Sequence, residues 1–290
     1  MEKENKNFSK FNKKSQKNIN FNEKNVNFNE KTEKIDYKKS LGQNFLYDKN
    51  LLNAIAKDGD IDSDDTVLEI GAGAGTLTEV LAQNSKRVIS FEIDKSLIPI
   101  LTERQNNNPN IEFHFQDFME ADITNLFDYQ ARVVANIPYY ITTPIIFKLI
   151  DHIEKFKSIL VLIQKEVAER FAAPCGNKSY GITSVILQSI FDVTMPRVVK
   201  KECFTPSPKV DSALCKLVPH NKYQIENFND FKNFIHLAFS MRRKTLINNL
   251  KSNYDKDLVI QCLKSFGYAE TVRPEEISVK NFIELYKLLK

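Results

Sequence analysis

The feature that most constrains this 290-residue chain is a glycine-rich turn between two apolar patterns. Residues 66–70 read TVLEI, an apolar run of strand length, and residues 71–75 read GAGAG. Apolar residues at helical spacing then cover residues 76–82. Because glycines carry no side chain, a ligand can approach the backbone N–H groups at the start of such a helix. The order of strand, glycine turn and helix therefore predicts a nucleotide site in an α/β fold.

An acidic residue after the next expected strand supports this site. Residues 87–91 form a second apolar run, and Glu92 follows it. A carboxylate about 20 residues past the first glycine can accept hydrogen bonds from the ribose hydroxyls of an adenosine ligand. A dinucleotide fingerprint needs glycine at its sixth position, where this chain has Thr76. Glu69, two residues before the first of the alternating glycines, instead resembles the pattern of class I S-adenosylmethionine-dependent methyltransferases.

Polar side chains also follow the third and fourth expected strands. Asp117 comes shortly after the run 111–115, and Asn136 directly follows the run 132–135. In a parallel sheet the carboxyl ends of the strands face one crevice, so these side chains should converge on the glycine turn. We therefore predict a doubly wound α/β domain. The Asp117 carboxylate is a possible base, but at a third-strand end it is expected to bind the adenine amine of the cofactor.

Residues 136–139 read NIPY and combine a carboxamide, a stiffened turn and an aromatic ring. The Asn136 oxygen and a backbone carbonyl near Pro138 can accept the two hydrogens of an exocyclic base amine such as adenine N6. Accepting them favours a more localised nitrogen lone pair, which can attack a methyl donor. Tyr139 can stack on the same base. Taken alone, the motif fits an ordinary Asn-Pro loop at a strand end better than it fits this chemistry.

Charge is distributed unevenly along the chain. Residues 1–39 carry 11 basic and 6 acidic side chains, residues 40–199 carry 14 and 21, and residues 200–290 carry 16 and 10. If the chain binds a polyanion, the basic ends are better placed than the middle to hold its phosphates. Residues 1–38 are rich in Lys and Asn and show neither helical nor strand periodicity, so we expect a disordered tail.

The remaining composition excludes several classes of protein. No apolar run approaches the ~20 residues of a membrane helix, and no signal-peptide pattern opens the chain. The cysteines and histidines show no metal-ligand spacing; they are Cys175, Cys203, Cys215, Cys262, His114, His152, His220 and His236. We expect a reduced, cytoplasmic, metal-free monomer without membrane contact.

Five motifs occur in a fixed order: LGQNFL at 41–46, GAGAG at 71–75, NIPYYITTP at 136–144, QKEVAER at 164–170 and FTPSPKVDS at 204–212. Together they resemble the ribosomal RNA adenine N6-dimethyltransferases of the KsgA/RsmA/Dim1 type, from about Lys39 to the last residue. By this resemblance the S-adenosylmethionine site is lined by Asn44, Leu46, Gly71, Glu92, Asp117 and Asn136. Tyr139 and Phe204 would sandwich the target base. One departure is Cys175, in a loop that the family usually closes with Pro-Gly.

The resemblance implies a doubly wound, Rossmann-like methyltransferase domain over residues 39–220 and a small all-helical RNA-binding domain over residues 221–290. Within the first domain, residues 158–163 should form a strand and residues 164–171 a helix. Two β-rich runs between residues 191 and 218 should form a hairpin that brackets the Phe204 loop.

The implied reaction transfers methyl groups from S-adenosylmethionine to N6 of two adjacent adenosines in a hairpin loop near the 3′ end of 16S rRNA, with a role in small-subunit biogenesis. The run Arg242, Arg243 and Lys244 would contact RNA phosphates, although three adjacent cations also suit a solvated face. Two alternatives stay open. An Erm-type enzyme would act on 23S rRNA, and the FTPSPKVDS motif argues against it. A ribosome-assembly factor of the same fold would bind RNA without turnover.

Overall fold

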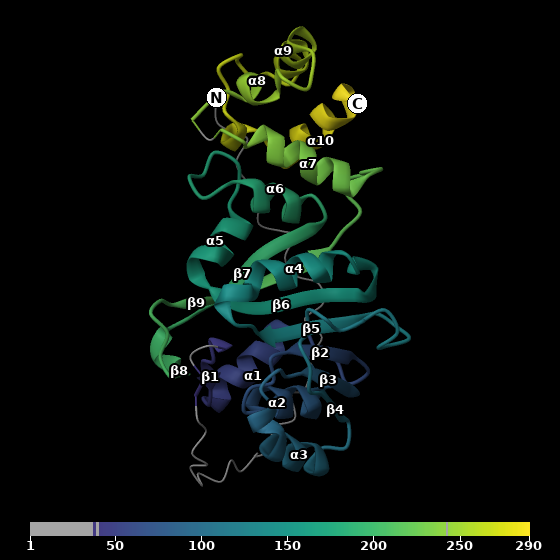
Figure 1. Ribbon diagram of the computed structural model, residues 1–290, viewed down its shortest axis with the longest axis vertical. Helices are drawn as coiled ribbons and strands as arrows, with labels where there is room; N and C mark the ends of the chain where they lie inside the picture. Colours follow the sequence, from purple (N-terminus) through teal and green to yellow (C-terminus); the bar gives the residue numbers. More distant parts are fainter. Residues whose placement is uncertain (1–36, 39–40, 242) are drawn as a thin grey trace, which may run out of the picture. The chain divides into compact units, whose positions relative to one another are not determined.

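The computed structural model describes residues 37–38, 41–241 and 243–290 of the chain. The expected disordered tail lies almost wholly outside these residues. Residues 35–290 group into one compact unit around a seven-stranded sheet with strand order β4-β3-β2-β5-β6-β9-β7 (Figure 1). The predicted α/β fold class is confirmed.

The sheet combines a parallel part and an antiparallel part. Strands β4, β3, β2, β5 and β6 pair in parallel, and β9 pairs antiparallel with both β6 and β7. The strands are β1 (Phe45–Leu46), β2 (Thr66–Ile70), β3 (Arg87–Phe91), β4 (Ile111–His114), β5 (Ala131–Asn136), β6 (Phe156–Gln164), β7 (Phe191–Val199), β8 (Phe204–Thr205) and β9 (Ser212–Pro219). The predicted β7–β9 hairpin is confirmed. Outside this sheet, β1 and β8 form a two-stranded antiparallel pair.

Helices fill the connections between the strands and form the C-terminal region. They are α1 (Lys49–Asp58), α2 (Thr76–Asn84), α3 (Ile98–Asn107), α4 (Thr142–Ile150), α5 (Lys165–Ala172), α6 (Ile182–Gln188), α7 (Phe228–Ala238), α8 (Leu246–Leu250), α9 (Lys256–Ser265) and α10 (Val279–Leu289). Helices α7 to α10 pack on one another, as expected for a helical C-terminal region (Figure 1). No helix among the residues described is both long and apolar enough to cross a membrane.

The glycine turn between β2 and α2 needs glycine for its backbone and for its packing. Gly71, Gly73 and Gly75 have φ of 82°, 55° and 76°, a left-handed region that side chains disfavour. A Cβ atom on Gly73 would also lie 2.9 Å from the Phe45 ring. The turn therefore lets β1 lie directly over the start of α2.

Two large apolar clusters hold much of the described part of the chain together. The first lies on the sheet and takes side chains from β2, β3, β5, β6, β7 and β9 and from α4 and α5. The second joins helices α7 to α10 with residues before the expected boundary at 220, among them Tyr180, Val185 and Ile186. The division into domains at residue 220 stays a prediction, because the second cluster spans that position.

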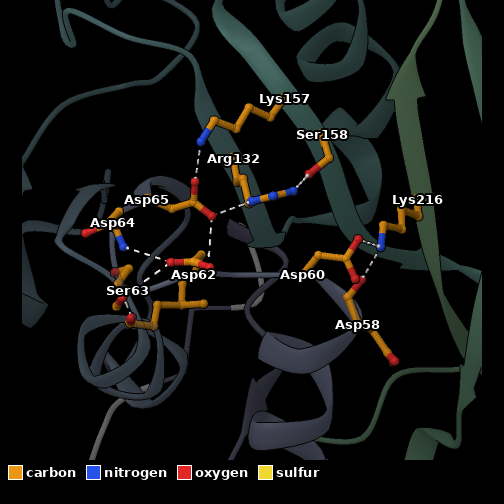
Figure 2. Close-up of polar contacts among 12 residues, drawn as sticks. Asp58, Asp60, Asp62, Ser63, Asp64, Asp65, Arg132, Lys157, Ser158 and Lys216 are labelled. Atoms are coloured by element: carbon orange, nitrogen blue, oxygen red, sulfur yellow. Dashed lines mark hydrogen bonds and ion pairs between the residues drawn. The ribbon is translucent and has the colours of Figure 1, made fainter. Parts of the chain in front are cut away.

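An ion-pair network joins the amino ends of three parallel strands, at the opposite end from the glycine turn (Figure 2). The buried Asp65 carboxylate accepts hydrogen bonds from Arg132 Nε and Lys157 Nζ, each at 2.6 Å. Arg132 Nη1 also donates to Ser158 Oγ at 3.0 Å. Since Asp65 precedes β2, Arg132 lies in β5 and Lys157 lies in β6, the network fixes the relative positions of these strands.

Candidate active site

A pocket opens at the carboxyl ends of β2, β3 and β5, and residues 41–46 form one of its walls. It brings together most residues that the sequence singled out: Asn44, Leu46, Gly71, Glu92, Asp117, Asn136, Pro138 and Tyr139. Of the other predicted residues that the structure describes, Phe204, Arg243 and Lys244 do not line the pocket.

Glu92 is held by two backbone N–H groups beside the glycine turn. Gly73 N donates to Glu92 Oε2 and Asp94 N donates to Glu92 Oε1, both at 2.7 Å. The residue is only 6% exposed, and burial raises the pKa of its carboxyl above the usual value although these bonds oppose the shift. Each oxygen keeps a second lone pair that can accept a ligand hydroxyl.

Glu69 lies deeper in the same wall. Thr78 and Ser90 hydroxyls both donate to Glu69 Oε2 at 2.6 Å, while Oε1 has no hydrogen-bond partner among the residues described. Burial raises the pKa of this carboxyl to about 8. Because Oε2 already accepts two hydroxyl hydrogens, the proton that the carboxyl holds below this pKa lies on Oε1, which can donate it at the pocket wall.

The Asn136 side chain has a defined orientation. Its Nδ2 donates to the backbone carbonyl of Asn44 at 2.9 Å, which joins the end of β5 to the wall formed by residues 41–46. The amide oxygen receives no hydrogen bond from any residue described. Since the nitrogen is engaged by a carbonyl, the amide presents an acceptor to the pocket.

The Tyr139 side chain is held by a hydrogen bond at its hydroxyl group. Its hydroxyl and Ser212 Oγ share a hydrogen bond of 2.6 Å, and burial raises the pKa of the phenol. Ser212 was not singled out from the sequence as a site residue, although it closes the FTPSPKVDS motif. The contact places the two strongest motifs of the chain, NIPY and FTPSPKVDS, next to each other.

The loop after β4 is held by a lysine that sequence reasoning missed. Asp117 Oδ1 accepts from Met119 N at 2.8 Å. Lys148 Nζ, from α4, donates to the carbonyls of Phe118, Met119 and Ala121 at 2.7, 2.8 and 2.6 Å. A lysine bound to three carbonyls has no sequence signature, because its partners are backbone atoms of a distant loop.

The remaining predicted residues lie outside the pocket lining. Phe204 is 3% exposed and pairs with Leu46 through the β1–β8 ladder. Arg243 and Lys244 are exposed between α7 and α8, and Arg242 lies outside the described residues.

A model of the family described as ribosomal RNA adenine dimethylase matches residues 35–290. The chain belongs to this family. A ribosomal RNA small subunit methyltransferase A of Bacillus mycoides (strain KBAB4) is 40% identical over 266 residues, which cover 87% of this chain and 91% of the relative. A protein of the same name from Bacillus cereus (strain B4264) has the same identity and coverage. The predicted family is confirmed, and with it an S-adenosylmethionine-dependent methyltransferase acting on rRNA adenine.

Solved structures agree with the family assignment. The 23S rRNA methyltransferase ErmE superposes with a TM-score of 0.72 at 26% identity, covering 85% of this chain and 99% of that one. A dimethyladenosine transferase from Plasmodium falciparum also has a TM-score of 0.72, at 31% identity, covering 83% of this chain and 95% of that one. The Rossmann-like methyltransferase fold is therefore confirmed.

The pocket suits the cofactor of a family methyltransferase. Two buried carboxyl groups, Glu69 and Glu92, lie beside a turn in which Gly71 and Gly73 bring no side chain. The Glu92 oxygens can accept the ribose hydroxyls of S-adenosylmethionine, and the glycines leave room for it.

Proposed function

We propose that this chain dimethylates N6 of two adjacent adenosines in a hairpin loop near the 3′ end of 16S rRNA and contributes to small-subunit biogenesis. Two observations support the small subunit over the large one. The relatives at 40% identity carry the name ribosomal RNA small subunit methyltransferase A. The FTPSPKVDS motif, whose Ser212 contacts Tyr139, also argues against an Erm-type enzyme.

The orientation of Asn136 carries the proposed mechanism. Its nitrogen is bound to Asn44 O, so its oxygen is the atom that can accept a hydrogen from adenine N6. A backbone carbonyl near Pro138 would accept the second hydrogen. With both hydrogens accepted, the N6 lone pair is less delocalised into the ring and attacks a methyl carbon more readily. These bonds strengthen as N6 becomes tetrahedral, so they favour the transition state.

The other pocket residues position the two reactants. Glu92 would accept the ribose hydroxyls of the cofactor, Asp117 its adenine amine, and Gly71 would allow its close approach. S-adenosylmethionine supplies an activated methyl group, so the reaction needs neither a metal ion nor a protein nucleophile. Tyr139, fixed by Ser212, would stack on the target base, and the proton from N6 would leave to water.

RNA is proposed to be held outside the pocket. The exposed Arg243 and Lys244, together with Arg242, suit contacts with RNA phosphates. The protein would act on the small subunit as a monomer in the cytoplasm, without membrane contact. The target adenine would be flipped out or already unpaired, because its amine cannot reach the pocket from within a stacked helix. By the family resemblance, Phe204 would complete the base site, which requires its side chain to leave its buried position beside Leu46.

The decisive experiment maps the methylated nucleotides. The protein is incubated with labelled S-adenosylmethionine and with small or large subunits that lack these modifications, and the labelled positions are identified by mass spectrometry. We expect dimethyl-adenosine at two adjacent small-subunit positions. Label confined to large-subunit RNA would favour the Erm-type alternative, and tight RNA binding without any label would favour the assembly factor.

A further inference from the structure

Asp94 is a buried carboxylate that no role in the reaction yet explains. It lies just beyond β3, two residues after Glu92, and is 2% exposed. Lys38 Nζ donates to its Oδ1 at 2.5 Å, and Gln43 Nε2 donates to its Oδ2 at 2.7 Å. Ser96 contributes two further bonds to Oδ1, from its backbone N–H at 3.0 Å and its hydroxyl at 2.6 Å.

The two residues that reach Asp94 from the N-terminal segment are also joined to each other. Lys38 N donates to Gln43 Oε1 at 2.8 Å, so Lys38, Gln43 and Asp94 form a closed set of hydrogen bonds. We call this set the Asp94 clasp. It ties Lys38 and Gln43 to the turn after β3, and Gln43 lies in the pocket wall that starts at Leu41.

The clasp is connected to both halves of the pocket. On the cofactor side, Asp94 N donates to Glu92 Oε1 at 2.7 Å. On the acceptor side, the residue after Gln43 is Asn44, whose carbonyl binds Asn136 Nδ2 at 2.9 Å. A continuous path of short contacts therefore runs from the ribose-site carboxylate to the amide that faces N6.

The clasp is charged under ordinary conditions. Burial opposes ionisation of Asp94, but hydrogen bonds from Lys38, Ser96 and Gln43 outweigh it and lower the pKa to about 2. Charge-assisted hydrogen bonds are about twice as strong as neutral ones. Charge-assisted contacts therefore tie Lys38 and Gln43 to the same turn that holds Glu92.

We propose that Asp94 is a positioning residue for methyl transfer. Through Lys38 and Gln43 it holds residues 41–44 against the strand ends, so that the Asn44 carbonyl keeps the Asn136 amide oxygen directed at the N6 position. This inference rests on the proposed role of Asn136 as the N6 acceptor. Asp94 contacts neither reactant; it acts through the segment that it holds.

The test compares Asp94→Asn with Gln43→Ala in the full chain, with Asp192→Asn as a matched control. Asp94→Asn keeps the size of the side chain but removes the charge that pairs with Lys38, whereas Asp192 forms an exposed pair with Lys222 away from the pocket. Gln43 is on the partly exposed segment, so its variant is expected to fold even if a buried Asp94 variant does not.

Three measurements follow. Amide hydrogen exchange over residues 38–46 should speed up in both clasp variants and not in Asp192→Asn. Affinity for S-adenosylhomocysteine, measured by calorimetry, should fall by about tenfold. Turnover should also fall by about tenfold. In an Asn136→Ala background, Asp94→Asn should reduce turnover little further, because both changes act on the same acceptor, the Asn136 amide oxygen.

The outcomes separate this inference from the proposed function. Unchanged exchange over residues 38–46, or fully additive losses of turnover in the double variant, would overturn the role of Asp94. If the unaltered protein methylates no rRNA, the proposed function fails instead. In that case the exchange and calorimetry measurements still decide whether the clasp holds the segment.

Discussion

At the scale of single residues, the fixed amide of Asn136 makes a prediction about products. Asn136→Ala removes one acceptor for N6, so methyl transfer should fall much more than binding of either substrate. Monomethyl-adenosine has one N6 hydrogen left and depends on a single acceptor. The variant should therefore shift the product toward monomethyl-adenosine, as measured by mass spectrometry of digested rRNA. An unchanged rate and product ratio would refute the hydrogen-bond mechanism.

Glu92 tests the cofactor site separately from RNA binding. Glu92→Ala removes the proposed acceptor of the ribose hydroxyls, and losing a charged hydrogen-bond partner costs about 1.5 to 3 kcal/mol. Cofactor affinity should fall by about ten- to a hundredfold in calorimetry. RNA affinity should stay the same, which serves as the internal control. Unaltered cofactor binding would remove Glu92 from the site.

Glu69 links the pocket to pH. Its pKa of about 8 in the folded chain lies above the ordinary value of 4.5, so the folded state holds the proton more tightly. This contribution to stability is complete below the ordinary pKa and is lost as the pH rises through about 8. Glu69→Gln cannot lose a proton, so its unfolding free energy should fall less between about pH 5 and pH 9 in urea titrations. The exposed Glu120→Gln is the control, and identical pH profiles for the two variants would count against a raised pKa.

Residues that follow strand ends could be placed from sequence, whereas their partners could not. Glu92, Asp117 and Asn136 were expected to converge because parallel strands end at one edge, and all three line one pocket. The bond from Asn136 to Asn44 spans 92 positions and ends on a backbone carbonyl, which any residue type would supply. Lys148 likewise donates hydrogen bonds to backbone carbonyls. Such contacts depend on tertiary packing and leave no local pattern in the sequence.

At the scale of elements, the Asp65 network should stabilise the sheet (Figure 2). Burial opposes ionisation of Asp65, but hydrogen bonds from Lys157 and Arg132 outweigh it and hold the pKa below its ordinary value. The network therefore adds stability above the ordinary carboxyl pKa and loses it as the pH falls through the lowered one.

Asp65→Asn should cost about 3 kcal/mol of unfolding free energy at neutral pH, because it leaves Arg132 without its carboxylate. Lys157→Met should cost less than about 1 kcal/mol, since that side chain is 44% exposed. Urea unfolding measures both losses of free energy, provided that the slope of the unfolding free energy against urea concentration is the same in each variant. Equal losses of unfolding free energy from the two variants would show that burial of the Asp65 carboxylate does not affect what the network contributes to stability.

Strands and helices were better predicted than the way short strands pair. The runs at 87–91 and 158–163 were identified because strands buried on both faces read as continuous apolar sequence. Strands β1 and β8 contain two residues each, too few to show any alternation. This short ladder pairs Phe204 with Leu46, and the expected place of Phe204 beside the target base stays a prediction.

At the scale of the whole molecule, RNA binding should depend on the basic run at 242–244. Neutralising Arg242, Arg243 and Lys244 should weaken RNA binding and flatten its salt dependence by ~0.7 to 0.9 per lost phosphate contact. Lys86→Ser is the control, because this exposed lysine lies before β3, at the sheet edge opposite the pocket. Filter binding across a salt series gives the slope of RNA affinity against salt concentration. A slope equal to that of the control would show that residues 242–244 are a solvated face and do not contact RNA phosphates.

The pairing of β1 with β8 also bears on how the chain matures during its synthesis. Residues 45–46 find their partner strand only at residues 204–205, so this ladder cannot form until the ribosome has made more than two thirds of the chain. At ordinary elongation rates the earlier segment waits on the order of 10 to 30 s for that partner. The wall over the glycine turn is thus completed only after β8 has been made, so cofactor capture belongs to a late stage of synthesis or to the finished protein.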